Sequence, residues 1–346
     1  MAKTFLFCVL LIGWGRCVFA IDYTTYYDLV NRAEQRFIAQ RDSSCYSAYD
    51  SAFAAYRPFI KDPYIAAQIA FSLRDERRMV HYLGIAAQAG MPLTAVNAAP
   101  LLRNGLNAQQ RAVIARVFES TVVTPPERPD LLDRVCAFCH ESDSIKLVMG
   151  TDPESNQAFW RSEAATLRFV LDSFLVHGRF INERVLGIST TAGRQDFLRR
   201  KGRRDPYAGY GPQPPEENEL RLKCPMNIVL HSRCFFTMHR PLFVQAMRNG
   251  FLHPKEFATL AETAVLWHQQ DDHSQEECIV VPDPDGYYNV FRGPSKHTFT
   301  DTPDGLAQVE RNRAAIHLQS YAVDQQKLAL ERSEGFAFFF DFVDRP

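Results

Sequence analysis

The sequence predicts a mainly α-helical fold, in which helical hairpins are followed by a helical domain with one small β-hairpin. Three observations lead to this prediction. Apolar and aromatic residues recur at spacings of three and four through residues 23–119, and again from about residue 131. Prolines and glycines interrupt these runs at short intervals. Two β-prone runs around an Asp-Gly pair, the pattern of a hairpin, occur at 279–291.

The N-terminal region, residues 21–121, is expected to form antiparallel helical hairpins because only short loops separate its helical runs. One aromatic stripe along a helix comprises Tyr46, Tyr49, Phe53 and Tyr56. Asn107 followed by Gln110 has the spacing of a helix-capping box. Segment 64–90 resembles a tetratricopeptide-type helical pair in its small residues and polar turn, although the tryptophan and Leu-Gly pair of that repeat are missing.

A proline-rich segment, residues 122–130, is the expected linker to a mainly helical C-terminal domain at 131–346. The strongest helical pattern spans 156–177, and Gly178 suits the position just after its end. The expected apolar face of that helix comprises Trp160, Ala164, Leu167, Leu171, Phe174 and Leu175. Further helices are expected at 225–236, 241–249, 254–268 and about 305–321, and 335–343 is either a final strand or a short buried segment.

Residues 194–218 are expected to form an exposed loop, because six of the eleven residues 194–204 are basic and glycine and proline follow. Basic residues near Tyr207 and Tyr210 could bind phosphate or polyanionic sugars, but a solvated loop is the more common use of such a run. Over the whole chain, 39 basic and 40 acidic side chains nearly cancel. The chain therefore has no strong net positive charge of the kind that would indicate a nucleic-acid partner.

The first twenty residues have the pattern of a secretory signal peptide, with Lys3, a short apolar run and Ala20 at the expected cleavage site. The apolar run is too short to span a bilayer, which takes about 20 residues. No later stretch is long and apolar enough, so no transmembrane segment is expected in the mature chain. The expected location is secreted or periplasmic.

Six cysteines remain after residue 20: Cys45, Cys136, Cys139, Cys224, Cys234 and Cys278. In an oxidising compartment they invite disulfides, whose pairing the sequence leaves open. Cys136-Ala-Phe-Cys139-His140 has the spacing of a haem c attachment site. The flanking residues continue a helical pattern, so we expect two packed helical thiols and no haem, with a disulfide between them as an alternative.

The histidines offer the main candidates for chemistry. His231 lies on an apolar helical run and is the candidate catalytic residue, because a buried imidazole must either find a hydrogen-bond partner or take part in a reaction. Together with His268, Asp272 and His273 it would supply nitrogen and oxygen ligands suited to zinc. A histidine near a helix end also interacts favourably with the helix dipole without any metal.

The order of features over most of residues 131–270 resembles a group of uncharacterised secreted bacterial proteins, in which tetratricopeptide-type hairpins often precede this domain. The positions that carry the resemblance are Gly178, Phe180, Val185, Gly187, His231, Gly250, Pro254, Phe257 and Ala258. These motifs are mostly structural and the Cys136–His140 segment is not among them. No activity is established for the group, so the resemblance implies a fold but no catalytic residue.

The leading functional hypothesis is a non-enzymatic interaction or scaffolding protein of the cell envelope, with a protein or peptide partner and no cofactor. Helical hairpins form concave surfaces that hold peptides or partner helices, and no known catalytic motif is present. The alternative is a hydrolase or metal-dependent enzyme centred on His231. The surroundings of His231 distinguish the binding hypothesis from the enzyme hypothesis. An enzyme needs a carboxylate or a second histidine within reach of His231.

Overall fold

The computed structural model describes residues 22–148, 153–188, 198–202, 224–268, 288, 290 and 302–339. The described residues are mainly helical and none of them lies in a β-strand, so the prediction of a mainly α fold is confirmed. Within these ranges no helix has the length and apolarity needed to cross a membrane. The expected signal peptide at 1–20 and most of the expected loop at 194–218 lie outside the described residues.

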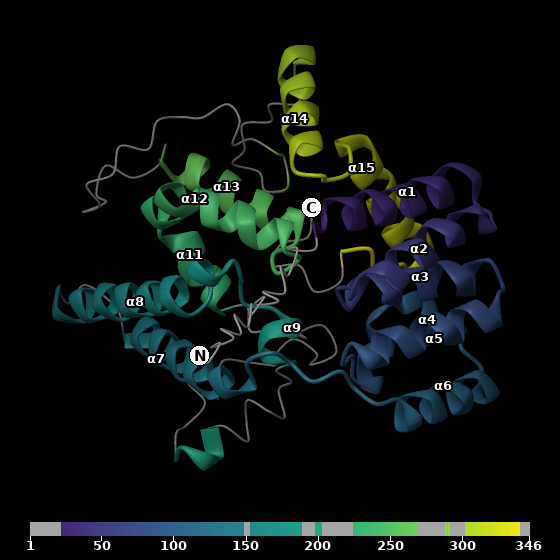
Figure 1. Ribbon diagram of the computed structural model, residues 1–346, viewed down its shortest axis with the longest axis horizontal. Helices are drawn as coiled ribbons and strands as arrows, with labels where there is room; N and C mark the ends of the chain where they lie inside the picture. Colours follow the sequence, from purple (N-terminus) through teal and green to yellow (C-terminus); the bar gives the residue numbers. More distant parts are fainter. Residues whose placement is uncertain are drawn as a thin grey trace, which may run out of the picture.

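The first half contains α1 (Thr24–Gln40), η1 (Ser43–Cys45), α2 (Tyr46–Ala55), α3 (Lys61–Ser72), α4 (Glu76–Gln88), η2 (Leu93–Ala98), α5 (Pro100–Gly105) and α6 (Ala108–Ser120). The second half contains η3 (Pro129–Leu131), α7 (Leu132–Val148), α8 (Pro153–Ser173), η4 (Leu175–His177), α9 (Glu183–Leu186), α11 (Cys224–His231), α12 (Arg233–Arg248), α13 (Pro254–His268), α14 (Pro303–Ala315) and α15 (Tyr321–Glu334). Figure 1 shows α1–α6 on one side of the molecule and α7–α13 on the other, while α15 returns to pack on α1.

The N-terminal helices pack as antiparallel neighbours, α1 with α2 and α3 with α4. Local sequence explains where they begin. Asp75 accepts a hydrogen bond from the backbone N–H of Arg78 at the start of α4. The capping box of Asn107 and Gln110 is present at the start of α6, as predicted. The helical pair expected at 64–90 is thus observed, whereas its relation to tetratricopeptide repeats stays a prediction.

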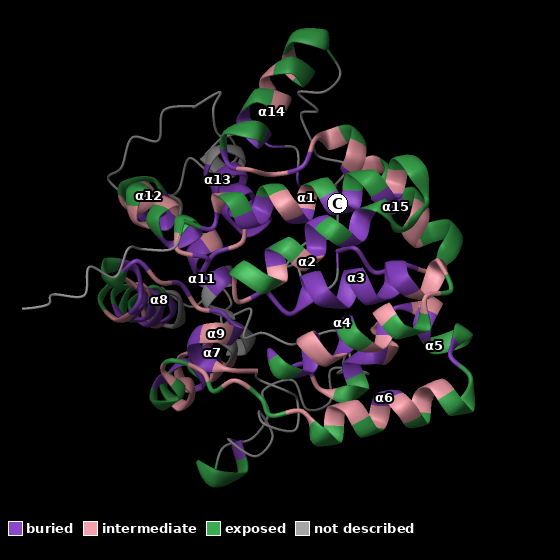
Figure 2. Cartoon of the chain, turned by 45° about the vertical axis from the view of Figure 1, so that its right-hand side comes forward, coloured by how far each residue is buried: buried purple, intermediate pink, exposed green. Residues whose placement is uncertain are grey.

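Two helices lie at the centre of the fold, one in each half. Every residue of α3 from 61 to 70 is buried, and so is every residue of α13 from 254 to 264 (Figure 2). Outer helices such as α6 are mostly exposed or partly buried instead, and Ile114 is the buried residue of α6. Apolar residues from both halves join in one hydrophobic cluster that extends from α1 to the segment 336–339.

The start of α1 joins the two halves by docking on the turn between α12 and α13. The backbone N–H of Tyr23 donates to the carbonyl of Arg248 at 2.8 Å, and the Tyr27 hydroxyl donates to the carbonyl of Met247 at 2.8 Å. Gly250 in this turn has φ +73°, and a Cβ added there would lie 2.5 Å from the Tyr23 ring. Both the backbone conformation and the close ring contact therefore require glycine.

The proline-rich segment 122–130 also bonds to both halves. The backbone N–H of Thr124 donates to the carbonyl of Gln88, and that of Glu127 donates to the carbonyl of Arg184. The Glu127 carboxylate forms an ion pair with Arg179, at 3.1 Å. This segment is therefore held along its length by backbone and side-chain contacts.

The predicted apolar face of α8 is correct only in part. Leu167 and Leu171 pack against the core, whereas Trp160 is 53% exposed and Ala164 is exposed. The fully buried residues of the helix are Phe159, Ser162, Glu163, Thr166, Phe169 and Val170. Half of these are polar, so apolar spacing alone did not identify them. Phe174 and Leu175 are buried as predicted, and Gly178 ends η4 in the left-handed conformation.

Other differences concern where helices begin and end. Pro241 lies inside α12, which begins at Arg233. Two rings before the proline, those of Phe235 and Phe236, each contact the ring of Phe243 after it. The helix expected at 305–321 ends at Ala315, and α15 follows after a turn.

The two segments for which strands were considered have different outcomes. The hairpin expected at 279–291 falls outside the described residues apart from Tyr288 and Val290, neither of which is in a strand. Residues 336–339 form a buried, non-strand segment, which was one of the two alternatives for this part of the chain.

Candidate ligand-binding cavity

The histidine site expected from the sequence is described only in part. His231 is the last residue of α11 and His268 the last residue of α13, and these two helices are in contact. The side chains of both histidines lie outside the described part of the structure, as do Asp272 and His273. Among the side chains that are described, no group of three His, Cys, Asp or Glu could hold a metal ion. The catalytic and zinc hypotheses stay predictions.

The Cys136–His140 segment lies within α7, as predicted. Cys136 is buried beside Leu198 and forms no disulfide, whereas Cys139 is disulfide-bonded. A bridge between these two cysteines is therefore excluded. A sulfur atom that is already in a disulfide cannot form the thioether bond that attaches haem c. Cys234 in α12 is also disulfide-bonded, and Cys45 is a buried thiol.

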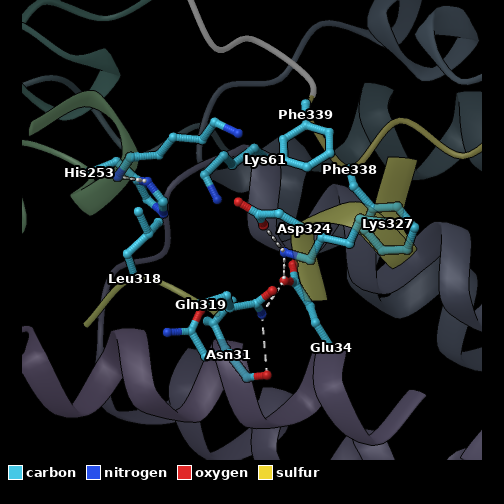
Figure 3. A pocket seen from close by; sticks show the side chains of 12 residues that line it. Asn31, Glu34, Lys61, His253, Leu318, Gln319, Asp324, Lys327, Phe338 and Phe339 are labelled. Carbon is cyan, nitrogen blue, oxygen red and sulfur yellow. Dashed lines mark hydrogen bonds and ion pairs between the residues drawn. The ribbon is translucent and has the colours of Figure 1, made fainter. Parts of the chain in front are cut away.

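A small cavity of about 30 Å³ lies where α1, α3, α13, α15 and the segment 336–339 meet (Figure 3). A cavity needs roughly 10–15 Å³ for one water molecule, so this one has room for two or three. The charged residues that line it are Glu34, Lys61, Lys255, Asp324 and Lys327. All five are buried. Full burial of so many ionisable groups is uncommon unless they are paired or functional.

The lysines occupy positions that the helices do not favour. Lys61 is the first residue of α3 and Lys255 the second residue of α13. The positive end of the helix dipole lies at the N-terminus, where a cation is unfavourable. An acidic residue, Asp62 or Glu256, follows each lysine and offsets part of this cost. Residue types that are unfavourable at their local position, such as a cation at a helix N-terminus, are expected to concentrate at functional sites.

Ion pairs hold most of the charges in the cavity wall. Lys61 pairs with Asp62. Lys327 pairs with Glu34 (Figure 3). The Nζ atom of Lys327 also lies 3.9 Å from Asp324. Among the described residues that line the cavity there are three lysines and two carboxylates, and a third carboxylate, Asp62, lies beside Lys61.

Behind the wall, Arg313 anchors the cluster and is fully buried. It pairs with Asp324, donates through Nε to the carbonyl of Gln319 at 2.5 Å, and donates through Nη1 to the carbonyl of Tyr288 at 2.8 Å. Burial alone would raise the pKa of Asp324, but the cations around it lower that pKa below its ordinary value. Asp324 therefore stays ionised.

Lys255 differs from the other lysines of the wall. Its side chain is 3% exposed, and its Nζ atom lies 3.8 Å from the centroid of the Phe339 ring. Burial lowers the pKa of Lys255 from 10.5 to about 7, and Arg313 and Lys327 contribute in the same direction while Asp324 opposes them. Near neutral pH the group is thus divided between its amine and ammonium forms.

Gln319 supplies an acceptor to the same cavity. Its Nε2 atom donates to Glu34 at 2.6 Å, whereas its Oε1 atom is buried and has no hydrogen-bond partner among the described residues. A buried acceptor without a partner costs about 1–3 kcal/mol. A water or ligand in the cavity that donates to Oε1 would remove this cost.

The cavity has a more open side. Asn31, His253 and Leu318 line it and are only partly buried, and Figure 3 shows them on the side opposite Lys327 and Phe338. The Nδ1 atom of His253 accepts a hydrogen bond from the backbone N–H of Lys255 at 3.1 Å. In its neutral form the ring therefore carries its proton on Nε2.

Comparisons with protein-family models, with curated proteins and with solved structures find no match to this chain. Sequence reasoning missed the cavity, because its side chains come from segments far apart in the chain. One local signal was present: in Lys61-Asp62-Pro63 and Pro254-Lys255-Glu256, a lysine next to an acid lies in the first turn of an apolar helix. That pattern alone is equally typical of a solvated helix end.

Proposed function

We propose that this chain is a non-enzymatic binding protein, secreted or periplasmic, whose cavity receives the anionic group of a small ligand. The observation that carries the proposal is that three buried lysines line one cavity, which also contains the acceptor Oε1 of Gln319. An anion that enters would lie among cations in surroundings of low dielectric, where charge attraction is much stronger than in water.

The size and polarity of the cavity limit the ligand. Room for two or three water molecules corresponds to a carboxylate group or a similarly small anion. A protonated carboxylic acid or a hydroxyl group beside the anion would satisfy Gln319, since Oε1 can only accept a hydrogen bond. Formate and acetate are therefore suitable probes, and the carboxylate of a peptide or metabolite is the natural counterpart.

Two observations support the proposed compartment. Cys139 and Cys234 are disulfide-bonded, which is the usual state of such cysteines outside the cytosol. The first twenty residues have the composition of a signal peptide. The protein or peptide partner in the envelope expected from the sequence is consistent with a site that holds one carboxylate, and it remains part of this proposal.

Titration calorimetry with formate and acetate tests the proposal. We expect saturable binding that Lys255→Met weakens at least about tenfold, while the exposed Lys201→Met leaves it unchanged. Anion binding favours the ammonium form of Lys255, so affinity should fall by about tenfold per pH unit above the pKa of about 7. Equal affinity in the wild type and Lys255→Met would contradict the assignment, and so would the absence of saturable binding.

A further inference from the structure

Lys255 combines features that suit it to chemistry as well as to charge recognition. It lines a cavity, its side chain is buried, and it lies over the face of Phe339. Burial in the cavity wall disfavours the charged form of an amine, so the surroundings of Lys255 favour its neutral, nucleophilic form.

We propose that Lys255 forms an imine with the carbonyl group of a small aldehyde or 2-oxo acid that enters this cavity. This inference shares its cavity with the proposed function. It does not require anion binding, because an aldehyde without an anionic group could also form the imine. A 2-oxo acid would use both properties of the site, with its carboxylate beside Lys61 and Lys327 and its carbonyl carbon at Lys255. The lowered pKa of Lys255, about 7, supplies the neutral amine that this reaction needs.

The reaction is balanced without an oxidant, reductant or cofactor. The lone pair of Nζ attacks the carbonyl carbon, a C–N bond forms, and the carbonyl π electrons move to oxygen. One amine proton passes to that oxygen and gives a carbinolamine. The C–O bond then breaks as nitrogen loses its second proton, so that one water leaves and a C=N bond remains.

Neighbouring groups fit these steps. His253 lies at the more open side of the cavity, and its neutral form carries a proton on Nε2 that can be donated to the developing oxyanion. The ammonium groups of Lys61 and Lys327 would stabilise the same negative charge. The Phe339 ring, 3.8 Å from Nζ, would stabilise a protonated imine through its π face.

Reductive trapping tests the inference on the full chain. The protein is incubated near pH 7 with acetaldehyde or glyoxylate and cyanoborohydride, and the labelled lysines are identified by peptide mass mapping. We expect Lys255 to be labelled at least about tenfold faster than the exposed Lys201, because burial lowers the pKa of Lys255 to about 7. Excess formate should slow labelling of Lys255 and leave Lys201 unaffected.

Two variants complete the test. Lys255→Arg keeps a positive charge but cannot form an imine, so the fast label should disappear from this position. The matched control Lys201→Arg, at an exposed position, should leave the fast label on Lys255 unchanged. Labelling of Lys255 no faster than that of Lys201 in the wild type would overturn the inference, whatever the folding of the variants. If formate binds and Lys255 is not labelled, the proposed function stands and the imine does not. If Lys255 is labelled by acetaldehyde while formate neither binds nor protects, the imine stands without the anion site.

Discussion

The pH dependence of stability offers a direct test of the environment assigned to Lys255. Its pKa is about 7 in the folded protein, against an ordinary value of 10.5. Between these two values the unfolded chain binds one more proton than the folded one. Stability therefore rises with pH across this window, and the contribution is lost as pH falls toward 7. Burial is the largest cause of the lowered pKa of Lys255. Arg313 and Lys327 lower this pKa further, whereas Asp324 and Glu331 raise it.

The magnitude follows from the difference between the two pKa values. One pKa unit corresponds to about 1.4 kcal/mol, and the slope flattens close to the folded-state pKa. From pH 7 to pH 9 the contribution of Lys255 to the free energy of unfolding should rise by about 2 kcal/mol. In Lys255→Met, which has an unbranched side chain one heavy atom shorter than that of lysine, this rise should be absent. Loss of the contact with Phe339 shifts the stability of the variant by a constant and leaves the slope unaffected.

Urea denaturation at several pH values between 7 and 9 measures the effect. The stability of Lys255→Met minus that of the wild type should fall by about 2 kcal/mol across this range. Subtraction cancels the contributions of all other titrating groups, including the buried tyrosines. Lys201→Met, an exposed control, should show the same pH slope as the wild type. Parallel slopes for wild type and Lys255→Met would refute the assignment of Lys255 as a buried group with a strongly lowered pKa.

Three other measurements examine the fold around the cavity. Gly250→Ala should destabilise the protein by about 2–5 kcal/mol, while Gly202→Ala, with positive φ but open space, should cost about 1–2 kcal/mol in the same denaturation assay. Arg313→Ala leaves a buried carboxylate without its partner and should cost about 3–5 kcal/mol, against about 0.5 kcal/mol or less for the exposed Arg311→Ala; similar losses for both would contradict the buried network. Burial raises the pKa of Cys45 to about 12, so iodoacetamide at pH 8 should alkylate it only after unfolding, and rapid native labelling would show that this thiol is accessible.

Local features of the fold were predictable because a few neighbouring residues determine them. The capping box at Asn107, the left-handed Gly178 and the bounds 254–268 of α13 depend on contacts within one or two helical turns. The buried face of α8 was not predictable in the same way. Its neighbours accept Ser162 and Thr166 in the interior, and only tertiary structure shows that these polar residues face inward.

The cavity was beyond sequence reasoning for a related reason. Glu34 and Lys327 form an ion pair although nearly the whole chain separates them. In the sequence, Lys255 belongs to an ordinary first turn of an amphipathic helix, where a lysine is expected to face solvent. Nothing within that turn shows that the segment 336–339 covers the side chain. Burial, and with it the altered chemistry of the amine, arises only when the segment 336–339 packs on α13.

A purely structural role for this charged cluster leaves two observations unexplained. Ion pairs such as Lys327–Glu34 and Arg313–Asp324 hold α15 to α1 and α14, but apolar residues of similar volume would do so at equal or lower cost in stability. A cluster that only holds helices together also needs no empty space, whereas these side chains surround a cavity of about 30 Å³. Such a cluster does not need the unsatisfied acceptor of Gln319 in the same wall either. Both features are expected of a site whose polar groups are completed by a ligand, because the cost of each is recovered only when the cavity is filled.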